Sequence, residues 1–259
     1  MNLLITLIML SIIVILHELG HYLMAKKAGV FVEEFAIGMG PKIVQYKGQD
    51  TLFSLRIFPI GGFCRMYGEL DEDDDGSNEK KEYCREIKPY ESYQNKSKKQ
   101  KFFILIAGPM MNFLLGFICL YIAYSFKLFP HEALLKSIAT SLDFFSMVFN
   151  SFYMLVMGQL GANEFVGPVG LVSVVGQFTS MGIEAILVLC AMLSINVGVF
   201  NLLPIPGLDG GQITILILEK ILKKEINPKW INLINIIGVV LLIVLMIFIM
   251  YNDILRIFT

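Results

Sequence analysis

Residues 1–25, MNLLITLIMLSIIVILHELGHYLMA, form an apolar run interrupted only by the sequence HELGH at residues 17–21. The run exceeds the roughly 20 residues that a helix needs to cross the hydrocarbon core of a bilayer. It has no cationic start and no small-residue cleavage site after it, so we expect a retained membrane helix (residues 1–26) and not a signal peptide. Residues four apart share one face of a helix, so both imidazoles can reach one ion.

The composition supports a membrane protein. Hydrophobic residues make up 56% of the 259-residue chain and charged residues 17%, whereas soluble domains have about 45–50% and about 25%. These values exclude an ordinary soluble globule and a disordered chain. The formal net charge of −1 gives no basic surface for nucleic acid, so we expect no nucleic-acid partner. Cys64, Cys84, Cys119 and Cys190 show no C-x-x-C spacing and are expected to be inert thiols.

Three further uncharged runs, residues 102–126, 185–208 and 230–252, predict membrane helices. The third-span segment is taken as 185–211, so that it includes the motif around Asp209. The predicted fold class is an all-α membrane core of four transmembrane helices with one small β element. That element is expected in residues 27–68, where short β-prone runs alternate with glycine and proline turn signals. We expect it to be a membrane-associated hairpin or sheet on the cytoplasmic side, followed by a charged cytoplasmic loop at 69–101.

The distribution of basic residues predicts the orientation. Most Lys and Arg residues lie in 26–101, and a second group lies in 212–229. Under the positive-inside rule both segments are cytoplasmic loops, and both termini, including the tail 253–259, are outside the cytoplasm. Residues 127–184 then form an outer loop. Its uncharged stretch 144–163 mixes polar with apolar residues, which favours an interfacial amphipathic helix.

The HELGH sequence predicts zinc chemistry. Zinc accepts neutral imidazole nitrogens and lowers the pKa of its bound water to about 7. Glu18 can take the proton from that water and pass it to a leaving amine. A His-Glu-His cluster in an apolar span is costly to bury without a function, which argues against two packing histidines.

A catalytic zinc keeps three protein ligands, so a third one is needed. His131 is expected beyond the second span on the outer side, too far away. Asp209 lies in NLLPIPGLDGG (residues 201–211), where prolines and glycines break the third span and could turn the carboxylate inward. If 144–163 does not cross the membrane, Asp209 reaches the same cytoplasmic depth as His17 and His21.

These motifs together resemble the site-2 protease family of intramembrane zinc metalloproteases (peptidase M50), in its regulator-of-sigma-E protease branch. The resemblance also covers FAIGMGPK (35–42), PIGGFCRM (59–66), AGPMMNF (107–113) and GPVG (167–170). It implies that His17, His21 and Asp209 bind one Zn²⁺ and that Glu18 is the acid/base. It further implies substrate contacts, which we assign to Asn201, Asn112 and Pro204.

The resemblance implies cleavage of the transmembrane segment of a single-span membrane protein within the lipid bilayer of the bacterial inner (plasma) membrane. An anti-sigma factor or a signal-peptide remnant would be such a substrate, and an upstream site-1 protease could trim it first. The β region would present the substrate as a strand. Family members usually carry PDZ domains between the second and third spans, but residues 127–184 are too few for one.

Two other interpretations remain. A divalent-metal transporter, or another metal-binding membrane protein, would share the intramembrane ligands but would need Glu18 less specifically. Residues 71–82 also fit the spacing of an EF-hand calcium loop. No helical pattern precedes them, so we expect a solvated acidic loop.

Overall fold

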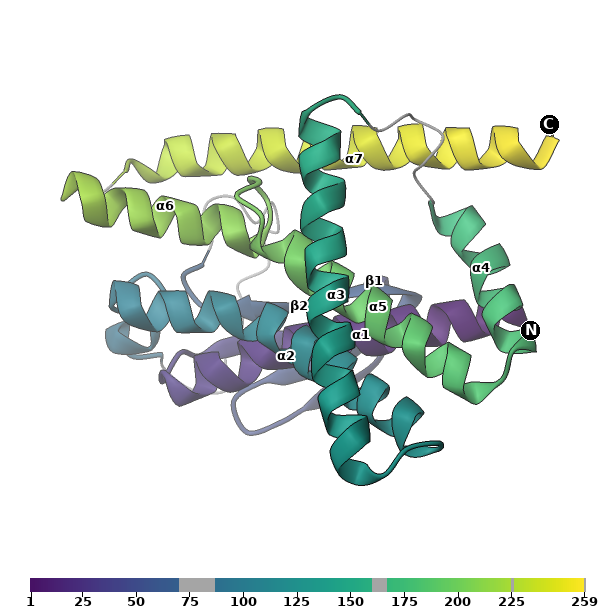
Figure 1. The fold of residues 1–259 in the computed structure, drawn as a ribbon. Coiled ribbons are helices and arrows are strands. Elements are labelled where there is room, and N and C mark those ends of the chain that lie inside the picture. The colour runs from purple at the N-terminus through teal and green to yellow at the C-terminus, as the bar shows by residue number, and fades with distance from the viewer. Residues whose placement is uncertain (70–86, 160–166, 225, 259) are drawn as a thin grey trace. The chain divides into compact units, whose positions relative to one another are not determined.

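The computed structural model describes residues 1–69, 87–159, 167–224 and 226–258 (Figure 1). The acidic segment 71–82 lies outside them. Within the described residues four helices contain a stretch long and apolar enough to cross a membrane, namely α1 (Asn2–Lys27), α2 (Lys98–Ser125), α5 (Ile183–Leu202) and α7 (Pro228–Phe258). A small antiparallel sheet accompanies them. The expected fold class, four membrane helices with a small β element, is therefore confirmed.

Local sequence sets the facing ends of α1 and α2. After α1, the Val30 N–H donates to the Ala25 carbonyl at 2.9 Å, and Gly29 has a φ of 72°. This is the glycine-ended cap that closes many helices. Before α2, the Gln100 N–H donates to Ser97 Oγ at 3.3 Å and the Ser97 N–H donates to Gln100 Oε1 at 3.1 Å. This reciprocal capping box fixes the first residue of α2.

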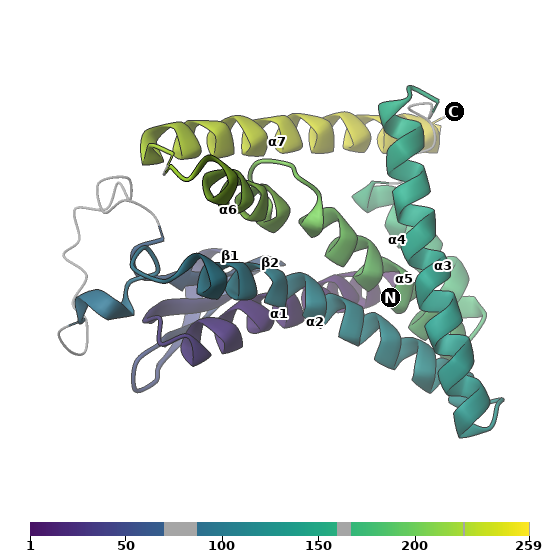
Figure 2. The same cartoon turned by 60° about the vertical axis from the view of Figure 1, so that its left-hand side comes forward.

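The β element is one long hairpin of β1 (Val32–Lys47) and β2 (Leu52–Met66), both labelled in Figure 2, and its strand pairing shows that it folds back on itself. Residues 34–37 have Cα partners in two stretches of β2, 52–55 and 62–65, so they are the inner part of the sheet. Residues 42–47 pair with residues 52–56 and form an outer segment of the sheet. The glycine and proline turn signal at residues 38–41 forms a bend within β1 and not a turn between two strands.

The structure divides into two compact units, of which one is Leu10–Met111. Its core joins the end of α1, the buried half of the hairpin and the start of α2. The buried members of that core are Ala25, Val30, Val32, Phe35, Cys64, Met66, Tyr93 and Ile104. Tyr22 and Phe35 add an edge-to-face contact with ring centroids 5.5 Å apart. Burial of each large apolar side chain contributes about 1.5–3 kcal/mol, so the hairpin is held by its inner half.

The other unit combines Met1–Met9 with Asn112–Thr259. It contains α3 (Pro130–Val156), α4 (Pro168–Ser180), α5, α6 (Asp209–Leu222) and α7. Helix α5 packs against α3, α4 and α6, and α4 also packs against α7. Ion pairing between Lys127 and Glu184 links the chain after α2 to the first turn of α5.

Two helices in this unit differ from the sequence expectation. Helix α3 begins at Pro130, well before the expected 144–163 stretch, and it is not among the apolar candidates for spanning in the described residues. Helix α4 occupies residues where the sequence suggested only a loop. The N–H groups at its start donate to a residue far away in the sequence. The Asp253 carboxylate accepts hydrogen bonds from the Gly167 N–H at 3.1 Å and from the Gly170 N–H at 2.8 Å. A cap 83 residues away leaves no local signal.

The third span also ends earlier than expected. Helix α5 stops at Leu202, and a short break precedes α6, which begins at Asp209 and runs into the expected loop 212–229. Pro204 and Pro206 lack N–H groups and clash with a preceding helical turn, which explains the break. Asp209 consequently sits at a helix start and not at the end of a long span.

Candidate active site

The histidines of α1 lie together as their spacing predicts. His17 and His21 are both buried, and their Nε2 atoms are 3.2 Å apart. The two rings are nearly perpendicular, at 79°. Two nitrogens each about 2.05 Å from a tetrahedral zinc would lie about 3.3 Å apart. The observed spacing therefore fits shared ligation of one ion.

A backbone group orients one of these rings. His21 Nδ1 is 2.8 Å from the carbonyl oxygen of Ile104 in α2. A carbonyl can only accept, so Nδ1 carries the proton and the neutral ring presents the lone pair of Nε2. Such outer contacts fix the tautomer of a metal-binding histidine and raise its basicity.

Glycines let α2 approach the histidines. A Cβ at Gly108 would overlap His21 Nε2 and lie 2.9 Å from His17 Cε1. A Cβ at Gly20 would likewise overlap the Ala107 carbonyl. In the sequence, residues 107–113 were recognisable only as a family motif, and no function was expected for Gly108. The structure assigns it the role of leaving room for both imidazoles, and its signal was the small-residue pair at 107–108.

Glu18 lies beside the hairpin. A Cβ at Gly62 of β2 would be 3.6 Å from Glu18 Cγ and 2.8 Å from the Ala36 carbonyl. The β2 backbone at Gly62 therefore lies beside the candidate general base, and the close Ala36 carbonyl leaves no room for a side chain at this position. Burial, followed by the nearby Glu18 and Glu69 carboxylates, raises the pKa of the Cys64 thiol. The neutral thiol is a poor metal ligand, because zinc binds thiolate.

Asp209 is positioned by a tightly packed turn in its own unit. It is the first residue of α6, and Cβ atoms at Gly210 and Gly211 would overlap the carbonyls of residues 202–205. A Cβ at Gly238 of α7 would overlap the Pro206 carbonyl. Three glycines therefore fix the backbone that carries Asp209. That its carboxylate completes the ligand set of His17 and His21 stays a prediction.

The residues assigned to substrate binding fall in two places. Asn201 lies in the last turn of α5, half-buried, and donates through Nδ2 to the Val197 carbonyl at 3.0 Å. Pro204 is exposed in the break that follows. Asn112 is fully buried in α2, where its carbonyl accepts from Ser194 Oγ at 2.8 Å. Asn112 therefore supports the packing of α2 on α5, and any contact of the three with substrate stays a prediction.

Apolar helices, one of which carries two buried histidines and a half-buried glutamate between them, are typical of a metallopeptidase of the membrane-embedded class. The sequence matches peptidase family M50 over residues 5–245. The chain therefore belongs to this family. It is a multi-pass membrane protein and a metalloendopeptidase of the site-2 protease type.

Similar proteins span the full chain. A Fusobacterium nucleatum protein is 29% identical and covers 100% of both sequences. Proteins named zinc metalloprotease RasP are 25% identical in Shouchella clausii (96% of this chain and 97% of the relative) and 24% identical in Oceanobacillus iheyensis (97% and 98%). The Fusobacterium alignment extends over 353 positions, more than this chain has residues, so that relative contains segments without a counterpart here. This is consistent with the expected lack of a PDZ domain.

Proposed function

We propose that this chain is a zinc-dependent intramembrane protease that cleaves the transmembrane segment of a single-span membrane protein. An anti-sigma factor or a signal-peptide remnant is a suitable substrate, after trimming by an upstream site-1 protease. The observation that carries the proposal is the buried pair of imidazole Nε2 atoms, 3.2 Å apart, with Glu18 on the same helix. The names of the relatives support zinc as the metal.

In this proposal His17, His21 and Asp209 are the residues that would hold one Zn²⁺. Two neutral nitrogens and one carboxylate oxygen are a ligand set typical of zinc hydrolases. Zinc, when bound, supplies an activated water and polarises the scissile carbonyl. The Ile104 carbonyl keeps His21 in the tautomer that can bind the metal.

Glu18 is the acid/base in this mechanism. Its carboxylate takes a proton from the attacking water and then donates it to the amine that leaves. Asn201 and Pro204 would contact the substrate, and Asn112 would lie close to the site. The hairpin would bind the substrate as an added strand, because a helical peptide bond is already hydrogen-bonded and inaccessible.

The proposed orientation puts residues 26–101 and 212–229 in the cytoplasm of a bacterium and both termini on the outer side of its inner membrane. The excess of Lys and Arg in these two segments supports it. The metal site then lies near the cytoplasmic surface. Substrate segments would be cut there, releasing a product toward the cytoplasm.

The deciding experiment uses the full-length protein in liposomes with a quenched-fluorescent signal peptide as substrate. Glu18→Gln should keep one zinc per chain, measured by mass spectrometry, while cleavage falls about 10³-fold because proton transfer is lost. Asp209→Ala should lose both zinc and cleavage. Glu132→Gln, a change in the exposed first turn of α3, is the control and should leave both unchanged.

Robust, metal-dependent cleavage by Glu18→Gln would contradict the proposal. Zinc flux into the same liposomes that requires Asp209 but not Glu18 would instead favour a transporter. Flux and proteolysis can be measured on one preparation, so the two functions are separated directly.

A further inference from the structure

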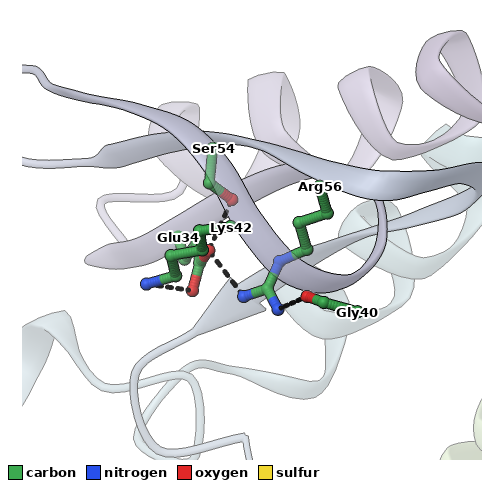
Figure 3. Close-up of polar contacts among 5 residues, drawn as sticks. All are labelled: Glu34, Gly40, Lys42, Ser54 and Arg56. Atoms are coloured by element: carbon green, nitrogen blue, oxygen red, sulfur yellow. Dashed lines mark hydrogen bonds and ion pairs between the residues drawn. The ribbon is translucent and has the colours of Figure 1, made fainter.

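A charged cluster lies in the hairpin, outside the metal-binding residues (Figure 3). Glu34 is 5% exposed, and its Oε1 accepts from Ser54 Oγ at 2.5 Å and from Arg56 Nη2 at 2.8 Å. Lys42 Nζ lies 3.6 Å from Oε2. Arg56 Nη1 donates to the Gly40 carbonyl at 2.7 Å. One arginine thus connects the inner strand segment to the bend in β1.

The surroundings of Glu34 favour the ionised form of its carboxyl group. Burial raises the pKa of Glu34, but hydrogen bonds from Ser54 and Arg56, together with the charges of Lys42 and Arg56, outweigh burial and lower it. A buried carboxylate is costly unless it is paired and hydrogen-bonded, and this one is both. Arg56 suits the position because its planar fork donates in two directions at once.

Arg56 reaches both bends of the hairpin. At the first bend, residues 38–40, the Gly40 carbonyl accepts a hydrogen bond from Arg56. The guanidinium carbon of Arg56 is also 4.8 Å from the ring centroid of Phe63. Phe63 directly follows the second bend, residues 58–62. The bends contact one another, since a Cβ at Gly61 would lie 2.9 Å from Met39 Cε.

The bends need such a brace because they are made of glycine. Gly38, Gly40 and Gly61 have φ values of 83°, 87° and 83°, a region that other residues rarely adopt. Glycine loses more conformational freedom on folding than any other residue. Side chains from elsewhere in the hairpin must therefore hold these segments in one conformation.

The second bend ends next to the candidate general base. Gly62 follows Gly61, and a Cβ at Gly62 would lie 3.6 Å from Glu18 Cγ. An unbroken series of contacts therefore runs from Glu34 through Arg56 to the backbone beside Glu18.

We propose that Glu34 and Arg56 are positioning residues for substrate, which brace the two glycine bends so that the backbone at Gly62 keeps its place beside Glu18. The inference rests on the proposed proteolytic function. Without the brace, the strand surface that receives an extended substrate is no longer preorganised. Substrate binding weakens, while chemistry on bound substrate proceeds at its former rate.

The test compares Arg56→Lys and Glu34→Gln with wild type, in the full-length protein in liposomes with the quenched-fluorescent signal peptide. We expect KM to rise about five- to tenfold with kcat changed less than about twofold. The double variant should match either single variant, because both break the same brace. Arg65→Lys is the matched control: its guanidinium lies 5.3 Å from the same Phe63 ring, and wild-type KM is expected.

Hydrogen exchange gives a second readout. Amides of residues 38–40, 58 and 60–63 should exchange at least about tenfold faster in both variants, with α1 and zinc content unchanged. Wild-type KM and exchange, a fall in kcat at constant KM, or loss of zinc would each overturn the proposal. Failure of the protease function itself is distinguishable, because wild type would then show no metal-dependent cleavage.

Discussion

The two places that carry the proposed zinc ligands are built in opposite ways. His17 and His21 stand on an uninterrupted helix, four residues apart, and their relative position follows from the helical period. Asp209 follows a break between two helices. Its position depends on glycines that let the backbone segments pack closely, one of them in α7.

The two halves of the proposed site are therefore sensitive to different substitutions. The histidine pair needs space, which Gly108 supplies from the facing helix α2. The aspartate needs a rigid turn, which Gly210, Gly211 and Gly238 permit. Changes far from Asp209 in sequence should therefore affect it, whereas the histidines should respond only to changes at the α1–α2 crossing.

Gly108→Val should have the largest effect. Its branched side chain would overlap His21 Nε2 and crowd His17, and overpacking of this kind is not relieved in a close-packed crossing. We expect zinc content below about a tenth of wild type and cleavage reduced by more than about 100-fold. Met110→Val, two residues on and 51% exposed, is the control. Full zinc occupancy in Gly108→Val would show that the imidazoles are not confined by α2.

Gly238→Ala should have a smaller effect, confined to the aspartate side. The added methyl overlaps the Pro206 carbonyl and displaces the turn before Asp209. We expect zinc affinity, measured by competition with a chelator, to fall about tenfold. Val240→Ala, at an exposed site on α7, should have wild-type affinity. Equal affinities for the two variants would mean that the turn does not depend on this contact.

Ser97→Ala should have the smallest effect. It removes the capping box of α2 and should lower the free energy of unfolding by about 1 kcal/mol, without changing zinc affinity. The thermal midpoint in detergent would fall by about 3 °C. Lys99→Ala, on the exposed side of the same turn, is the comparison. A change in zinc binding by Ser97→Ala would indicate that the start of α2 influences the histidine region.

The sequence was sufficient for the features that depend on local pattern. Uninterrupted apolar runs predicted the four membrane helices, and glycine-punctuated β-prone runs predicted the hairpin. It was insufficient where a distant residue decides the structure. Asp253 caps the start of α4, and Gly108 leaves room for His21. Neither contact produces a periodic pattern in the sequence. The extension of α6 beyond Asp209 was missed because the charge pattern there suggested only a loop.

The central claim is that His17, His21 and Asp209 ligate a single zinc ion, and X-ray absorption at the zinc edge of the purified protein tests it most directly. Wild type should show one zinc per chain bound by two imidazole nitrogens and oxygen ligands at about 2.0–2.2 Å. In Asp209→Ala the zinc should be lost. An unchanged zinc content and spectrum in Asp209→Ala would contradict the account.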